Sequence, residues 1–194
     1  MRIQKYIDKL LIIFVLPLIL PLCCLIYFLI KKEGHSPIFK QIRVGKNKVP
    51  FTLYKFRSMK PMAPQALTHE CPEKFYTKTG HFIRKFKIDE LPQFINVFNG
   101  SMSLVGPRPG LLEDQKLIEE RQNRNLYNYL PGITGCSQIM NICMDEPVKL
   151  AKFDEVTIKL RKNFFFYILM LIATIFTSKS IVKKRITSFL LKNI

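Results

Sequence analysis

An uninterrupted run of 21 apolar residues, Leu10–Ile30, constrains this chain more than any other feature. Coiled as an α-helix, the run would be roughly 30 Å long, which matches the hydrocarbon core of a bilayer. It is long for a signal peptide and lacks a small-residue cleavage site, and a chain of 194 residues is too small to wrap it in a core. The sequence therefore predicts a helix inserted in a membrane.

Two prolines, Pro17 and Pro21, lie in the middle of this run. Each lacks a backbone N–H and clashes with the carbonyl four residues earlier, so the pair predicts a sharp bend in the helix. Basic residues flank the run on both sides, and the positive-inside rule would keep both ends in the cytoplasm. Such a helix is a re-entrant hairpin. A kinked span across the bilayer is the alternative that these residues leave open, because spanning helices tolerate proline.

The charge of the chain indicates an anionic partner. Its 31 Lys and Arg outnumber 14 Asp and Glu, a net charge of +17. Such a surplus suits anionic membrane lipid, nucleic acid or a phosphorylated substrate. A nucleic-acid binder needs no membrane segment, so the apolar run argues against that class and no nucleic-acid partner is expected. Five cysteines without a CxxC pair argue against both a disulfide framework and a zinc site.

Residue patterns predict a short series of elements after the apolar run. Residues 38–58 predict a β-hairpin, and 80–87 form a short basic amphipathic stretch. From Asp89 to Gly100 the apolar residues recur with helical spacing, which predicts a helix that begins with Asp89 as its N-cap. Further helices are expected at 111–130, with Arg121 on a solvated face, and at 151–160, with a turn at 131–135 between them.

Residues 164–177 are almost entirely apolar but too few to span a membrane comfortably. Basic residues bracket this segment on both sides. An apolar segment between cations is typical of a helix that lies in the interface of anionic lipid. A buried C-terminal helix with a solvated basic tail is the alternative.

The adjacent carboxylates Asp89 and Glu90 are the strongest candidates for chemistry. At a helix N-terminus, free N–H groups and the helix dipole favour negative charge and attract phosphate. Asp89 should stay ionised and could attack a phosphorus centre, while Glu90 could hold Mg²⁺ together with substrate phosphates. An ordinary capping Asp followed by Glu is the structural alternative.

Four basic residues are candidates for phosphate contacts. Lys55 and Arg57 lie on the predicted hairpin, and Arg84 precedes Asp89 by five residues. Arg108 lies between two prolines in Gly106–Pro109, where the fixed backbone predicts a rigid loop that aims the arginine. Pro109 is therefore counted with the substrate-binding group. Arginine suits bidentate phosphate contacts, and lysine acts as a point charge.

Five segments in order resemble the bacterial sugar transferases, the monotopic polyprenyl-phosphate phosphoglycosyl transferases. They are Phe39–Gly45 (FKQIRVG), Tyr54–Met59 (YKFRSM), Asp89–Val97 (DELPQFINV), Met102–Pro109 (MSLVGPRP) and Pro131–Gly135 (PGITG). The resemblance covers about residues 5 to 170, and the size is similar to that of the minimal members. The chain departs from the usual family pattern at Leu20, Ser101, Leu130 and Thr157, while the Asp-Glu pair is intact.

The resemblance implies a monotopic enzyme on the cytoplasmic face of the inner membrane. It would transfer a phospho-sugar from a UDP-sugar to undecaprenyl phosphate and release UMP, which starts glycoconjugate assembly. It implies Asp89 as a nucleophile that forms a covalent intermediate, Glu90 as the residue associated with Mg²⁺, and phosphate contacts from Lys55, Arg84 and Arg108. The helix break of the family falls on Pro21, which favours the re-entrant alternative. The sugar, the glycan and the oligomeric state stay open.

The expected fold class is α+β and mostly helical, with a re-entrant membrane helix, a small β-hairpin and a helical catalytic core carrying interfacial amphipathic helices. The expected domains are a re-entrant membrane helix (1–32) and a cytoplasmic, membrane-associated catalytic domain with a basic apolar C-terminal segment (33–194). The rival class is a non-catalytic membrane-bound scaffold that kept the fold. Such a scaffold would not need Asp89, Glu90, Lys55 and Arg108 together, and all four are present.

Overall fold

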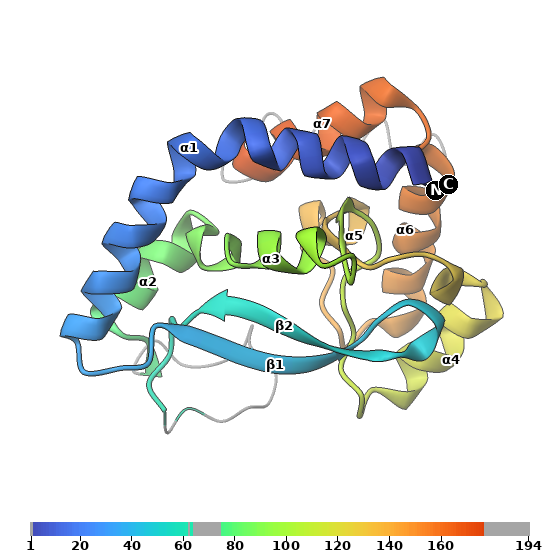
Figure 1. Ribbon diagram of the computed structural model, residues 1–194. Coiled ribbons are helices and arrows are strands. Elements are labelled where there is room, and N and C mark those ends of the chain that lie inside the picture. Colours follow the sequence, from blue (N-terminus) through green and yellow to red (C-terminus); the bar gives the residue numbers. More distant parts are fainter. Residues whose placement is uncertain (1, 62, 64–74, 177–194) are drawn as a thin grey trace. The chain divides into compact units, whose positions relative to one another are not determined.

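The computed structural model describes residues 2–61, 63 and 75–176, which form a mostly helical chain with two small two-stranded sheets (Figure 1). The chain divides into two compact units. The first comprises Met1–Gln41 and Thr52–Gly100, and the second comprises Ile42–Phe51 and Ser101–Ile194. The predicted α+β class is thereby confirmed. The predicted domain boundary at residue 32 would divide a membrane helix from a cytoplasmic domain. This boundary is of a different kind from the division into compact units, and it stays a prediction.

Helix α1 (Arg2–Lys32) contains the whole apolar run, with Pro17 and Pro21 inside it. Figure 1 shows that its path changes direction near the middle, as expected where proline removes a backbone donor. Among the described residues, this is the one helix long and apolar enough to cross a membrane by length and composition. Whether it crosses or re-enters stays a prediction.

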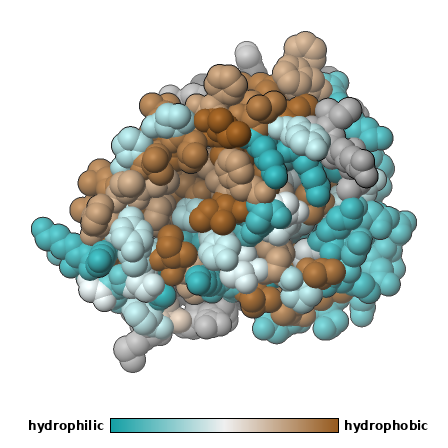
Figure 2. Space-filling model, in the orientation of Figure 1, coloured by the Kyte–Doolittle hydropathy of each residue, from teal (hydrophilic) through white to brown (hydrophobic). Residues whose placement is uncertain are grey.

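Between Leu10 and Leu29 most of α1 is exposed, and the exposed side chains of that stretch are apolar. Phe14 and Leu18 are 83% and 82% exposed, and Figure 2 shows hydrophobic surface along the helix. Ile26 and Ile30 near its C-terminal end are buried instead, in a cluster with Phe56 and Ile83. The C-terminal end of α1 thus belongs to the core of the first unit. The rest of the helix exposes a long apolar surface, which is unfavourable in water and indicates contact with a lipid or protein partner.

The predicted hairpin is confirmed as β1 (Ile38–Val44) and β2 (Pro50–Phe56), joined by the 3₁₀ helix η1 (Lys46–Lys48). Its tight connection places Asn47 and Lys48 at positive φ. Asparagine adopts this left-handed conformation more readily than most residues, which is why it suits the turn.

After the hairpin, the first unit continues through α2 (Lys78–Lys85), the 3₁₀ helix η3 (Ile88–Glu90) and α3 (Gln93–Phe98). The prediction that an α-helix begins at Asp89 is therefore wrong. Asp89 lies inside η3, and the N-cap of α3 is Pro92. Pro92 has no N–H to donate back to Ile88, so the chain forms a tighter turn there, with Leu91 N–H bonded to Ile88 O at 3.1 Å.

The second unit is built around two parallel strands, β3 (Ser103–Val105) and β4 (Gly132–Thr134). Ser103 pairs with Gly132 and Val105 with Thr134. The prediction of a simple turn at 131–135 is therefore wrong. Gly106 and Gly132 approach so closely that a Cβ on either would clash with the backbone beside the other, a contact that spacing along one segment could not reveal.

Helices α4 (Gln115–Asn123), α5 (Cys136–Ile139), α6 (Pro147–Leu160) and α7 (Phe164–Phe176) complete the second unit, with the 3₁₀ helix η4 (Leu126–Asn128). The expected helix at 151–160 is confirmed within α6. The single helix expected at 111–130 is wrong, because Asn125 adopts a left-handed conformation (φ 55°) that ends helical structure before η4.

Helix α7 is partly buried and partly exposed. Tyr167, Met170 and Ala173 are buried, whereas Phe164 and Phe165 are 64% and 83% exposed. The buried side contacts α5, β3 and β4. The predicted helix is thus confirmed, with one buried side, as in a buried C-terminal helix, and one exposed apolar end, as in an interfacial helix. Its contact with lipid stays a prediction. The basic residues of the predicted tail, Lys179–Arg185, lie outside the described residues.

Candidate functional site

Asp89 and Glu90 occupy adjacent positions of η3 but different environments. Asp89 is 8% exposed, whereas the Glu90 side chain is 27% exposed. The Lys55 ammonium lies 3.1 Å from Glu90 Oε1. The first unit therefore joins a buried carboxylate, a reachable carboxylate and a cation from a different element.

Burial raises the pKa of the Asp89 carboxyl from its ordinary value of 3.8 to about 6. The charges of Lys55 and Arg84 oppose this rise, and the neighbouring Glu90 adds to it. At pH 7 a group with this pKa is about nine-tenths ionised. That Asp89 is charged at neutral pH stays a prediction, and the cause of its altered pKa is burial rather than a helix N-terminus.

Arg84 comes to this site from the last turn of α2. Its guanidinium lies 4.9 Å from the centre of the Tyr76 ring and within 3.5 Å of the Ser58 hydroxyl. Helix α2 packs tightly on the chain beside Ser58, because a Cβ on Gly80 would clash with the Ser58 backbone. The glycine thus lets α2 approach the segment that follows β2.

Lys55 lies in β2 and Arg57 directly follows that strand, but the two side chains have different contacts. Its Nε donates to Ser36 O at 2.9 Å, and its guanidinium lies 5.8 Å from the centre of the Phe39 ring. These contacts hold the end of β2 to the start of β1. A phosphate contact of Arg57 stays a prediction.

Arg108 and Pro109 belong to the second unit, where the predicted rigid loop is anchored on both sides. Pro107 O accepts from Gly132 N–H at 2.8 Å, and Pro109 O accepts from the buried Arg43 guanidinium at 3.3 Å. The Arg108 N–H donates to Asp154 Oδ1 at 3.4 Å. The backbone around Arg108 is thus fixed by three contacts from other segments.

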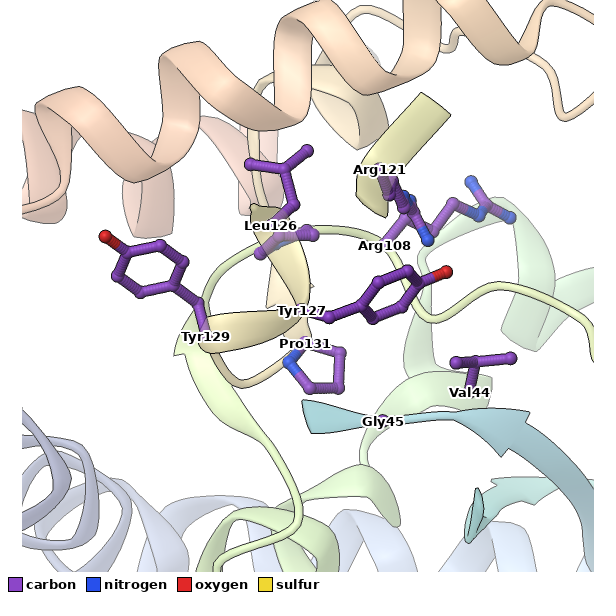
Figure 3. Close-up of a pocket in the computed structure, with 9 residues that line it drawn as sticks. Val44, Gly45, Arg108, Arg121, Leu126, Tyr127, Tyr129 and Pro131 are labelled. Carbon is purple, nitrogen blue, oxygen red and sulfur yellow. The ribbon is translucent and has the colours of Figure 1, made fainter. Parts of the chain in front are cut away.

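A small pocket of about 240 Å³, part of it open to solvent, lies beside this loop (Figure 3). Only about 10 Å³ of this space has room for a group the size of a water molecule, so the pocket as it stands is far below the roughly 300–1,000 Å³ of typical small-molecule sites. Figure 3 shows the Tyr127 hydroxyl directed to the side on which Arg108 and Arg121 lie. Burial raises the pKa of Tyr127, and Arg121 opposes that rise. The lining residues are Val44, Gly45, Pro107, Arg108, Arg121, Leu126, Tyr127, Tyr129 and Pro131.

The prediction that Arg121 lies on a solvated helix face is wrong. Arg121 is 2% exposed, and its Nε and Nη2 donate to Asp154 Oδ2 at 3.0 and 2.5 Å. Asp154 is fully buried and also accepts from the Ser137 hydroxyl at 2.7 Å. Burial raises the pKa of Asp154, against the effect of Arg121 and Ser137. The polar run QKLIEERQN suggests a solvated helix, and it holds no signal that one arginine turns inward.

Sequence reasoning also missed Asn96, the most deeply buried polar residue of the first unit, at 0% exposure. Its position on the predicted helix, between the apolar residues Ile95 and Val97, is the signal that could have found it.

The described residues contain no group of three or more His, Cys, Asp or Glu side chains that could hold a metal ion. Mg²⁺ in phosphate-transfer sites usually binds through one or two carboxylates, with substrate phosphates and water as the other ligands. The pair Asp89 and Glu90 suits that kind of site, and the exposure of Glu90 leaves its carboxylate reachable from solvent.

Residues 1–180 match the bacterial sugar transferase family, and the chain belongs to that family.

Several relatives are similar over much of the chain. Uncharacterized sugar transferase EpsL of Bacillus subtilis is 46% identical over 61% of this chain and 61% of its own length. A putative undecaprenyl-phosphate N-acetylgalactosaminyl 1-phosphate transferase of the same organism is 39% identical, over 69% of this chain and 72% of its own length. The UDP-glucose:undecaprenyl-phosphate glucose-1-phosphate transferase of Escherichia coli is 40% identical over 68% of this chain, but only 30% of its own length.

Proposed function

We propose that this protein transfers a sugar-1-phosphate from a UDP-sugar to undecaprenyl phosphate and releases UMP. The observation that carries the proposal is the buried Asp89 carboxylate, with Glu90 adjacent to it and the charges of Lys55 and Arg84 acting on it. Family membership and the activity named for the Escherichia coli relative support the same reaction.

The reaction would proceed in two displacements at one phosphorus atom. An Asp89 carboxylate oxygen attacks the phosphorus that carries the sugar, and the bond from that phosphorus to UMP breaks as UMP leaves with the electron pair. An oxygen of undecaprenyl phosphate then attacks the same phosphorus, and the Asp89 carboxylate leaves. The covalent intermediate lets a soluble donor and a lipid acceptor use one small site in turn.

The surroundings of Asp89 suit this role. A buried carboxylate has lost most of its hydrating water, so little solvent must be removed before it approaches phosphorus. Lys55 and Arg84 would offset the negative charge of the donor diphosphate and of the transition state. In the second unit, Arg108 would add a bidentate phosphate contact, because its loop fixes the backbone from which the guanidinium extends.

Glu90 would hold Mg²⁺ together with the donor phosphates. The bound ion would supply positive charge that polarises the diphosphate and stabilises the UMP leaving group. Glu90 is also the partner of Lys55, so the same cation that pairs with the carboxylate at rest would be close to the phosphates once they bind.

The exposed apolar surface of α1 supports a place in the inner membrane, with the catalytic site on its cytoplasmic face. The phosphate of the acceptor lies at headgroup level, so the nucleophile must be near the interface. A re-entrant α1, bent at Pro17 and Pro21, would anchor the protein from one side, and anionic lipid would attract its net charge of +17.

The intact mass of the protein tests the covalent step. Mixing the purified protein with a panel of UDP-sugars and Mg²⁺, without lipid acceptor, should add the mass of one phospho-sugar at Asp89. Undecaprenyl phosphate should then remove the adduct. Asp89→Asn should give neither adduct nor UMP, and Glu90→Gln should be severe but partly relieved by excess Mg²⁺.

Two contrary results have distinct meanings. Substantial turnover by Asp89→Asn would show that the lipid phosphate attacks the donor directly. Failure of the wild-type protein to release UMP from any UDP-sugar would favour the non-catalytic scaffold instead.

A further inference from the structure

The Asn96 side chain forms hydrogen bonds with the backbone of β2 that a neighbouring strand would otherwise form. Its side-chain Nδ2 donates to Thr52 O at 2.7 Å, and its Oδ1 accepts from Tyr54 N–H at 3.1 Å. Among the described residues, β2 belongs to a two-stranded sheet with β1, so its other edge has no strand beside it. One amide from α3 thus satisfies a donor and an acceptor on alternate residues of β2.

This contact links the two segments that carry the charged pair of the site. Lys55 directly follows Tyr54 on β2, and Glu90 precedes Asn96 by six residues in the segment that contains η3 and α3. The hydrogen bond between Asn96 and Tyr54 therefore determines which residue of β2 lies opposite η3. A shift of one residue would turn Lys55 to the other face of the strand.

The Lys55–Glu90 pair is too weak to set this register by itself. Both side chains are about one quarter exposed, and partly exposed ion pairs contribute little because water and salt screen them. The bonds of Asn96 differ, because its side chain is wholly buried and each broken bond would leave a polar group without water. The buried amide is thus the stronger constraint on the strand.

We propose that Asn96 is a positioning residue of the transferase site, which holds Lys55 at Glu90 by fixing β2 against α3. The inference rests on the proposed function for its effect on catalysis, but the positioning itself can be measured without turnover. Asn96 would act through the backbone of β2, because its hydrogen bonds to Thr52 O and Tyr54 N–H are both made to that backbone.

Amine labelling measures the positioning directly. In the wild type, pairing with Glu90 should slow the reaction of the Lys55 amine with an acylating reagent, and mass spectrometry can follow that one site. Asn96→Leu, which keeps the branched shape of the side chain but has no amide, should speed labelling of Lys55 by about threefold or more. Asn99→Ala, which changes an exposed asparagine at the end of the same helix, should leave the rate unchanged.

A double-mutant cycle measures the effect on catalysis. If Asn96 acts through Lys55, Asn96→Leu should reduce formation of the phospho-sugar adduct by about 10- to 100-fold in the wild type. In a Lys55→Met background it should cost almost nothing further, because the interaction it supports is already lost. A residue that serves the fold alone would reduce the rate by the same factor in both backgrounds.

Asn96→Asp provides a second variant if the leucine protein does not fold. It keeps the acceptor for Tyr54 N–H and loses the donor to Thr52 O, so labelling of Lys55 should lie between the rates of the wild type and a Glu90→Gln protein. Unchanged labelling in folded Asn96 variants would overturn the inference, as would equal factors in both backgrounds. Faster labelling in a protein that never cleaves a donor would support the positioning and reject the proposed function.

Discussion

At the scale of single residues, the chain places ionisable groups where burial decides their behaviour. Asp89 is a carboxylate that the fold keeps mostly out of water, with its pKa raised to about 6. Proteins rarely bury an isolated acid without a use for it, because the charged form is destabilised. The cost to stability is thus a physical signature of the proposed nucleophile.

We expect Asp89→Asn to increase stability at neutral pH while it abolishes turnover. A pKa of 3.8 in the unfolded chain and about 6 in the folded one corresponds to about 3 kcal/mol of destabilisation above pH 6. That cost decreases as pH falls through 6 and is absent below 3.8, so the advantage of the variant should vanish there. Thermal unfolding in detergent at pH 7.5 and pH 3.5 measures this. A variant less stable than the wild type at pH 7.5 would contradict it.

Arg108 and Arg121 line the same pocket but should respond differently to substitution. Arg108→Ala removes a proposed phosphate contact, so turnover should fall about 10- to 100-fold with little change in stability. Arg121→Ala leaves the buried Asp154 without its cation, so it should cost about 3–5 kcal/mol of unfolding free energy. Lys116→Ala, on an exposed position of α4, is the matched control.

Unfolding curves and UMP release separate these effects. An Arg121→Ala protein as stable as the wild type would show that the ion pair with Asp154 does not hold this unit together. Equal turnover by Arg108→Ala and Lys116→Ala would show that Arg108 acts only as a general surface charge.

At the scale of elements, α1 combines strong helix-forming apolar sequence with two residues that disrupt it. Pro17 and Pro21 each remove one backbone hydrogen bond, yet the helix continues through both with a change in direction (Figure 1). The same bend would serve either topology, since a re-entrant helix must turn within the bilayer and a spanning helix tolerates a kink.

Cysteine labelling from each side of the membrane distinguishes the two topologies. In a background without the native cysteines, residues 4 and 35 should both be labelled from the cytoplasm, because basic residues flank both ends of the helix. Replacing Pro17 and Pro21 with Leu should restore the two hydrogen bonds, straighten α1 and favour a span. Periplasmic labelling of position 4 alone in the unaltered helix would establish a span instead.

At the scale of the whole molecule, two kinds of attraction would hold the protein at the membrane. The net charge of +17 attracts anionic headgroups, and α1 exposes an apolar surface that water does not stabilise. Salt screens the first attraction, since the Debye length falls to about 3 Å at 1 M, but it does not weaken the second.

The protein should therefore stay in the membrane fraction after a wash in about 1 M salt and leave it only with detergent. Removal of residues 1–25, which keeps Ile26 and Ile30 in the core of the first unit, should make the remaining attachment salt-sensitive, because charge and α7 alone would then hold the chain. Immunoblots of washed membranes measure both. Release of the full-length protein by salt alone would show that α1 is not inserted.

The sequence by itself determined the features that depend on neighbours along the chain. The apolar run of α1, the hairpin and the helix at 151–160 each follow from local composition and periodicity, and the order of the motifs indicated the family. Asp89, Glu90, Lys55 and Arg84 were selected by residue type and spacing, and the structure describes all four within one unit.

The tertiary structure alone decided what depends on residues distant in sequence. Gly132–Thr134 becomes a strand because β3 lies beside it, and Arg121 turns inward because Asp154, 33 residues later, supplies a buried carboxylate. Asn96 fixes β2 from 42 residues away. Burial and pairing are properties of the packed chain, and a periodic pattern carries no information about which distant group will meet a given side chain.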